Sequence, residues 1–305
     1  MKKRLGKKWD IEIISALKIG GPVEGISCRF EGDNRAVVVY PGDYQSLMKY
    51  GMTAKDIGKY LARKAEEGRK EVPDLPKTVE EFREGLYVKV VNSEVNQELL
   101  KNTVHDAWDD IAAVAYCRIS MEGKENISFL VTKDNMSSFE MTQNEIMEKA
   151  YRNTSEQKFC IKNMNDILWE FIPSQRMPEE MMEDIRQNIE SPFFVLTNEE
   201  MLNGANAIVC PKVLARAYEQ LGEPYYILPS STHEVILVKE SAGLSTAAMK
   251  EMVREVNTET VLPKELLSFN VFRYDGRKLS AIKEDAQETT KTAEKIMEKT
   301  GKLTR

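Results

Sequence analysis

Side chains that bind metals or form disulfides are scarce in this sequence, which has two histidines and four cysteines among 305 residues. The cysteines, at positions 28, 117, 160 and 210, form no C-x-x-C pair and have no histidine at zinc-finger spacing. This pattern argues against a zinc finger and against a disulfide scaffold. We therefore expect four reduced thiols in a cytoplasmic protein.

Long apolar runs are also missing. No segment approaches the roughly 20 apolar residues that a membrane-spanning helix needs. The chain starts with the basic stretch MKKRLGKK, and no apolar stretch follows it. We therefore expect neither a secretory signal nor a membrane segment.

Signatures of nucleotide and nucleic-acid binding are absent as well. There is no phosphate-binding loop and no G-x-G-x-x-G fingerprint, and the aromatic residues are scattered. The net charge is −6, whereas a nucleic-acid-binding domain usually carries a basic stripe. The basic start from Lys2 to Lys8 is either a solvated tail or an arm that contacts phosphates. We expect no cofactor.

The composition that remains is that of a globular protein, with 42% apolar and 30% charged residues. Short β-branched runs alternate with segments of helical periodicity. This mixture predicts an α+β fold, in which hairpins and small mixed or antiparallel sheets are covered by helices.

The predicted domain organisation has three parts. Residues 1–70 form an N-terminal strand-and-helix unit, a proline-containing linker follows, and residues 77–282 form an α+β core. Residues 283–305 are a charged tail with few apolar residues. Strands of the N-terminal unit are predicted at 11–19, 24–30 and 35–40, before a helix that starts at Thr53.

Three further segments resemble capping boxes, in which a threonine and a glutamate three residues later satisfy the first turn of a helix. These pairs are Thr78 with Glu81, Thr142 with Glu145, and Thr197 with Glu200. Each pair predicts the start of a helix. The apolar segment at 207–210 predicts a short strand.

An internal similarity suggests a degenerate duplication. Residues 129–153 and 194–220 each contain an apolar strand ending in threonine, a polar turn with methionine, and a helix ending in Ala-Tyr. If they are related, Tyr151 and Tyr218 occupy equivalent places and the core consists of two related modules.

Several segments together resemble a known family. FVLTNEEMLNGA and YILPSSTHEVILV are similar to the C-terminal half of an uncharacterised bacterial family known only as a domain of unknown function. The resemblance spans about residues 10–275, and its most specific part is the turn from Pro229 to Val235. It implies relatedness and no activity.

The same turn holds the first group of candidate site residues. His233 lies between two predicted strands, next to Ser230, Ser231 and Glu234. Serine, histidine and a carboxylate are the parts of a hydrolytic site. Sequence neighbours rarely form such a triad, however, and the alternative is a proline-led hairpin loop whose hydroxyls bind its own backbone. In that alternative His233 is at least partly exposed or is bonded to a nearby carboxylate.

His105 provides a second candidate. If its segment is helical, His105 and Asp109 share one face. Together with His233 and Glu234 they would offer two imidazoles and two carboxylates to a metal ion, although the spacing matches no metal signature. The alternative is a structural histidine.

Three functional hypotheses remain at this stage. The first is a non-enzymatic cytoplasmic protein that binds another protein. The second is a hydrolase or metal-dependent enzyme centred on His233. The third is an accessory protein for nucleic acids or mobile elements that uses the basic N-terminus.

Overall fold

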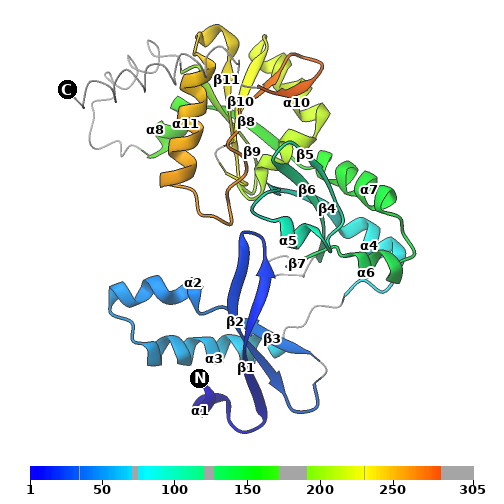
Figure 1. The fold of residues 1–305 in the computed structure, drawn as a ribbon, viewed down its shortest axis with the longest axis vertical. Coiled ribbons are helices and arrows are strands. Elements are labelled where there is room, and N and C mark those ends of the chain that lie inside the picture. The colour runs from blue at the N-terminus through cyan, green and yellow to red at the C-terminus, as the bar shows by residue number, and fades with distance from the viewer. Residues whose placement is uncertain (34, 71–74, 120–126, 172–190, 230, 283–305) are drawn as a thin grey trace, which may run out of the picture. The chain divides into compact units, whose positions relative to one another are not determined.

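A computed structural model describes residues 1–33, 35–70, 75–119, 127–171, 191–229 and 231–282 (Figure 1). The described residues form helices and three antiparallel sheets, which confirms the predicted α+β fold. The chain divides into two compact units: residues 1–157 with 262–266, and residues 158–261 with the chain from 267 onward. The predicted linker lies within the first unit, so the division near residue 77 stays a prediction. The predicted tail lies outside the described residues.

The first sheet has the strand order β1-β2-β3 and contains β1 (Trp9–Lys18), β2 (Gly21–Phe30) and β3 (Ala36–Val39). Helix α1 (Lys2–Leu5) precedes it, and α2 (Gly42–Gln45), η1 (Ser46–Tyr50) and α3 (Ala54–Lys70) follow. The predicted strands and the helix after Thr53 are confirmed. The backbone N–H of Asp56 donates to the hydroxyl of Thr53 at 3.3 Å, as the capping pattern predicts, and this hydroxyl donates to the Asp56 carboxylate at 2.6 Å.

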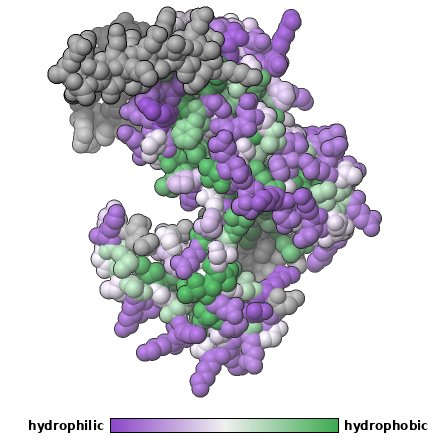
Figure 2. Space-filling model, viewed as in Figure 1, coloured by the Kyte–Doolittle hydropathy of each residue, from purple (hydrophilic) through white to green (hydrophobic). Residues whose placement is uncertain are grey.

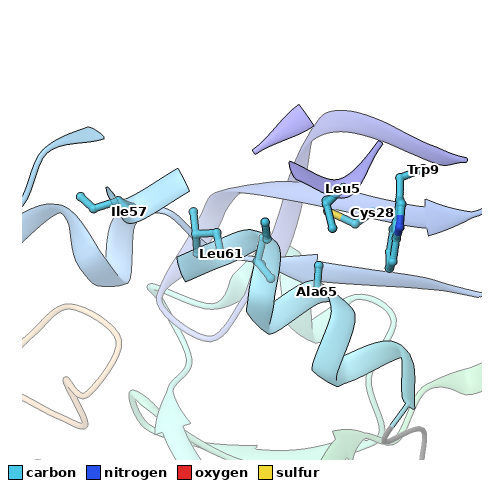
Figure 3. Close-up of a cluster of buried hydrophobic side chains, with 8 residues drawn as sticks. Leu5, Trp9, Cys28, Ile57, Leu61 and Ala65 are labelled. Carbon is cyan, nitrogen blue, oxygen red and sulfur yellow. The ribbon is translucent and has the colours of Figure 1, made fainter. Parts of the chain in front are cut away.

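Helix α3 covers one face of this sheet because its apolar residues recur every four positions. Ile57, Leu61 and Ala65 lie on that face and form a core with Trp9 and Cys28 of the sheet (Figure 3). The indole ring of Trp9 also contacts Phe30 edge to face at 5.5 Å. The N-terminal segment therefore has an apolar core of its own.

The second sheet has the order β4-β6-β5, with β7 also paired to β6. Its strands are β4 (Leu86–Asn92), β5 (His105–Trp108), β6 (Ile111–Ile119) and β7 (Ile127–Leu130), and its helices are α4 (Val79–Gly85), α5 (Gln97–Leu100), α6 (Lys133–Ser138) and α7 (Gln143–Ser155). Complete capping boxes at Thr78 and Thr142 start α4 and α7, which confirms both predictions. Strand β6 is central and is buried from Ile111 to Cys117.

The third sheet belongs to the second unit and has the order β13-β12-β10-β11-β9-β8. Its strands are β8 (Phe159–Asn163), β9 (Phe193–Asn198), β10 (Tyr225–Leu228), β11 (Val235–Lys239), β12 (Phe272–Tyr274) and β13 (Leu279–Ala281). Its helical segments are α8 (Met164–Phe171), η2 (Gly204–Val209), α10 (Pro211–Leu221), η3 (Glu240–Ala242) and α11 (Thr246–Glu259). Met249 and Val253 of α11 pack on Leu228 and Val238 of this sheet.

Two local predictions are wrong, and the condition set for His105 is not met. Residues 207–210 are not a strand, because they continue the 3-10 helix η2 and lead into α10. Thr197 does not start a helix, because it lies in β9 and pairs with Cys160 of β8. His105 lies in a strand instead of a helix, since β5 pairs with β6.

The proposed duplication stays a prediction. Both segments contain a strand, a short helical turn and a longer helix in the same order: β7, α6 and α7 in one, and β9, η2 and α10 in the other. The two tyrosines have different surroundings. Tyr151 donates to the carboxylate of Asp106 at 3.1 Å, whereas Tyr218 contacts the ring of Tyr274.

All four cysteines are free thiols, as predicted. Cys28, Cys117 and Cys210 are buried, and Cys160 is half-buried. Burial raises the pKa of Cys28 and of Cys117 to about 11. Within the described residues, no helix has the length and apolar content needed to cross a membrane.

Candidate functional site

The loop between β10 and β11, residues 229–234, is the hairpin connection that its sequence predicts. The two strands pair antiparallel, with Leu228 opposite Ile236. Ser231 is buried, while His233 and Glu234 are half-buried. Ser230 lies outside the described residues. His233 is thus partly exposed, as the hairpin interpretation allows.

Ser231 organises this loop through its side chain. Its hydroxyl donates to the Glu234 carboxylate at 2.7 Å and accepts from the backbone N–H of His233 at 2.9 Å. The prediction that a loop hydroxyl binds the loop's own backbone is confirmed. This pattern is an ordinary serine turn, in which the hydroxyl replaces a backbone partner.

A second turn, residues 199–203 between β9 and η2, is held by one asparagine. The Asn198 side chain accepts from the N–H of Leu202 at 3.1 Å and donates to the carbonyl of Leu202 at 2.8 Å. Met201 and Asn203 have φ values of 51° and 55°. Non-glycine residues rarely adopt this left-handed conformation, which costs about 1–3 kcal/mol at each position.

The hairpin loop and this second turn are bonded to each other. The Thr197 hydroxyl donates to the carbonyl of His233 at 2.8 Å. The N–H of Asn203 points at Nδ1 of the His233 ring at 3.3 Å, and the N–H of Ala205 donates to the carbonyl of Thr232. Because Nδ1 accepts in this contact, the ring carries its proton on Nε2 when neutral. His233 therefore fixes one turn to the other.

Gly204 is required by the closeness of this contact. A Cβ atom at this position would overlap the hydroxyl oxygen of Thr197 and the carbonyl oxygen of His233. Glycine is the residue that permits such a close approach of backbone segments. The sequence did contain a signal for it, since Asn203-Gly204 is a strong turn dipeptide. Thr197, Asn198 and Asn203 were not identified from the sequence as site residues.

Two apolar side chains project from the second turn. Met201 is 70% exposed and Leu202 is 51% exposed. Their backbone is bonded at both ends of the turn, so their positions are restricted even though their side chains face solvent. Residues 197–204 together with 231–234 are named the turn network below.

The contacts of the turn network are those of a structural element. In a serine hydrolase the nucleophilic hydroxyl donates to an imidazole, whereas the hydroxyl of Ser231 donates to the carboxylate of Glu234. The Nδ1 atom of His233 is engaged with a backbone N–H. A catalytic role for Ser230, Ser231, His233 or Glu234 stays a hypothesis.

The second histidine has a different environment. His105 lies in β5, and its Nδ1 atom is 3.0 Å from the carbonyl oxygen of Thr103. Asp109 has a φ of 47° and belongs to the tight turn between β5 and β6, so the two residues do not share a helix face. His105 lies in the first unit and His233 in the second. In the described part of the chain, no three His, Cys, Asp or Glu residues gather to hold a metal ion.

A pocket of about 520 Å³ lies in the first unit, between α4 and the end of the second sheet. Its charged lining residues have both signs, and the guanidinium of Arg118 lies 4.8 Å from the centre of the Tyr87 ring. The volume is within the range of small-molecule pockets. None of the described sequence candidates lines it.

Comparison with known protein families places the chain in a family. The model of a family of unknown function, DUF5688, matches residues 1–276. The chain belongs to the DUF5688 family. The resemblance to a family of unknown function is thereby confirmed for this DUF5688 protein. No curated protein and no solved structure matches the chain.

Proposed function

We propose that this DUF5688 protein is a non-enzymatic cytoplasmic protein that binds another protein through Met201 and Leu202. The observation that supports this proposal is their exposure on a turn with a strained and firmly bonded backbone. Exposed apolar side chains on a rigid support are favourable contacts, because little conformational entropy remains to be lost on binding. Methionine is common at such surfaces, since its thioether adapts to different partners.

The direct test is to remove the two apolar side chains without changing the turn. The variant Met201→Ser/Leu202→Ser keeps the backbone bonds of Asn198. The matched control is Met252→Ser/Val256→Ser on α11, where the same number of apolar side chains is exposed, at 37% and 40%. Both variants should melt within a few degrees of the wild type, because surface substitutions change stability by about 0.5 kcal/mol or less.

Affinity capture from the native host identifies the partner. The dissociation constant of the purified partner is then measured for the wild type and for both variants. We expect the turn variant to bind its partner at least about 30-fold more weakly, as for a central contact worth about 2 kcal/mol. The control should bind like the wild type. Equal binding by the turn variant and the wild type would refute the proposed contact.

The two other hypotheses have separate tests. Metal content and hydrolysis assays test the enzyme hypothesis. The nucleic-acid hypothesis predicts binding that weakens steeply as the salt concentration rises. Within the basic segment, Arg4 forms an ion pair with Glu66 at 3.7 Å, so part of its charge is already balanced.

A further inference from the structure

Strand β1 has an outer edge whose backbone groups have no partner strand among the described residues. In the sheet order β1-β2-β3 it lies at the side, and among the described strands only β2 pairs with it. The N–H of Glu31 donates to the carbonyl of Lys8 at 2.8 Å, so the even-numbered residues of β1 are bonded to β2. The N–H and C=O groups of the odd-numbered residues 11, 13, 15 and 17 therefore point away from the sheet.

This edge has only some of the features by which proteins protect an exposed strand. Its ten residues contain no proline and no glycine, and the charged residues among them are Asp10, Glu12 and Lys18. Ile13 is 73% exposed and Leu17 is 47% exposed, and Figure 2 shows apolar side chains at the surface of the N-terminal part. A long edge strand with exposed apolar side chains can be a template for a further strand.

The outer edge of the third sheet provides a contrast within the same chain. There, two side chains of α10 bind the carbonyl groups of edge strand β8. Arg216 donates to the carbonyl of Phe159 at 2.6 Å, and Gln220 donates to that of Ile161 at 3.4 Å. Strand β8 is thus bonded by side chains along its edge, whereas within the described residues β2 is the one strand that pairs with β1, and helix α5 contacts β1.

We propose that two copies of this chain pair through the outer edges of their β1 strands, antiparallel and about a two-fold axis at Ile14. This register places Asp10 opposite Lys18 of the second copy, so opposite charges meet at both ends. It also places Ile11 opposite Leu17 of the second copy, so apolar side chains meet. Pairs of these kinds are the favourable cross-strand contacts of antiparallel sheets.

The neighbouring registers are less favourable. An axis at Ile13 places Lys8 opposite Lys18 of the second copy, and it requires the N–H of Trp9, which already donates to the carbonyl of Gly6. An axis at Ser15 shortens the paired segment. With the axis at Ile14, the two copies share one sheet formed by both sets of β1, β2 and β3. The proposal is independent of the Met201 contact, because β1 lies in the first unit and that turn in the second.

Cysteine cross-linking tests the register. Ile14→Cys should give a disulfide-linked dimer under mild oxidation, because residues facing each other at a non-hydrogen-bonded position have Cα atoms about 4.5 Å apart. The control Glu12→Cys should give none, since each Glu12 faces Ala16 of the second copy. The wild type measures the background of disulfide-linked dimer that forms through Cys160, the half-buried native thiol.

Charge exchange tests the same register without oxidation. Asp10→Lys should weaken the dimer at least about tenfold in sedimentation experiments, because like charges then face each other at both ends. Adding Lys18→Asp should restore the dimer. If Asp10→Lys lowers the melting temperature through its exposed partner Arg29, Ile13→Lys is the second test, because Ile13 faces solvent.

The outcomes are distinct. A dimer that cross-links at position 14 and follows the charge exchange supports the proposal. A monomer at every concentration, a dimer that cross-links at position 12, or a disulfide between the Ile14→Cys variant and a different protein would overturn it. None of these results depends on Met201, so a failure here leaves the proposed function to its own test.

Discussion

Replacing Gly204 with alanine tests the turn network most directly. The added Cβ would overlap the hydroxyl oxygen of Thr197 and the carbonyl oxygen of His233, and would lie 2.8 Å from the backbone nitrogen of Asn198. Overpacking a rigid site costs about 1–3 kcal/mol, and loss of the Thr197 hydrogen bond adds about 1 kcal/mol. We therefore expect Gly204→Ala to lower the free energy of unfolding by about 2–4 kcal/mol.

Gly243→Ala is the matched control in the same unit. Gly243 has a φ of 65°, and nothing lies within 4 Å of a Cβ added there. It should lose only about 1 kcal/mol, through backbone strain. Denaturant unfolding followed by circular dichroism gives both values, and hydrogen exchange in β9 and β11 locates the loss. If the two alanine variants lose the same stability, the close packing around Gly204 is not what fixes the turns.

Three further predictions use other contacts. Thr197→Val should lower the free energy of unfolding by about 1–3 kcal/mol, because the carbonyl of His233 loses its buried donor. Thr197→Ser keeps the hydroxyl and should retain most of the stability. Under native conditions Cys160 should react with a thiol reagent before Cys28, whose pKa burial raises to about 11; equal rates would show that Cys28 is accessible. The hydrogen bond from Arg273 lowers the pKa of Glu240, so its stabilisation is present at neutral pH and is lost as the pH falls through that lowered pKa. The variant Glu240→Gln should therefore lose less stability than the wild type on acidification, which pH-dependent melting would measure.

Local signals in the sequence were reliable where all partners lie within one turn of the chain. The capping boxes at Thr78 and Thr142 formed as expected, because threonine and glutamate are three residues apart. Thr197 has the same pattern but lies in a strand. Its segment pairs with β8 and β11, and its hydroxyl binds the carbonyl of His233, which is 36 residues away. Tertiary contacts overrode the local preference for a helix.

Two short strands, β5 and β8, were not predicted from the sequence. Strand β5 has the sequence HDAW, in which polar and apolar residues do not alternate as they do in a typical half-buried strand. It forms because Trp108 and Ile111 pair across a tight turn in which Asp109 has a positive φ. Strand β8 has five residues, and its edge is bonded by side chains of α10. Arg216, which donates to this edge, is 57 residues from Phe159 in sequence.

Buried asparagines also act over distances that the sequence does not show. The side chain of Asn153 in α7 donates to the carbonyl groups of Arg83, Glu84 and Leu86, which joins α7 to the start of β4. Asn257 of α11 likewise donates to the carbonyl of Ser268 at 2.7 Å. A sequence pattern treats asparagine as a turn or surface residue, whereas these two side chains connect helices to neighbouring backbone.

The strain in the turn network has a consequence for function. Met201 keeps a positive φ although glycine would remove that strain at no steric cost. Its side chain is mostly exposed, so packing in the described structure gains little from it. The bonds of Asn198 and His233 to this turn offset the strain and restrict the backbone at the same time. A strained and restricted residue with an exposed apolar side chain is useful to a protein that must present that side chain in one orientation. The same bonds explain why a histidine and a serine stand in the hairpin loop, without requiring that either takes part in catalysis.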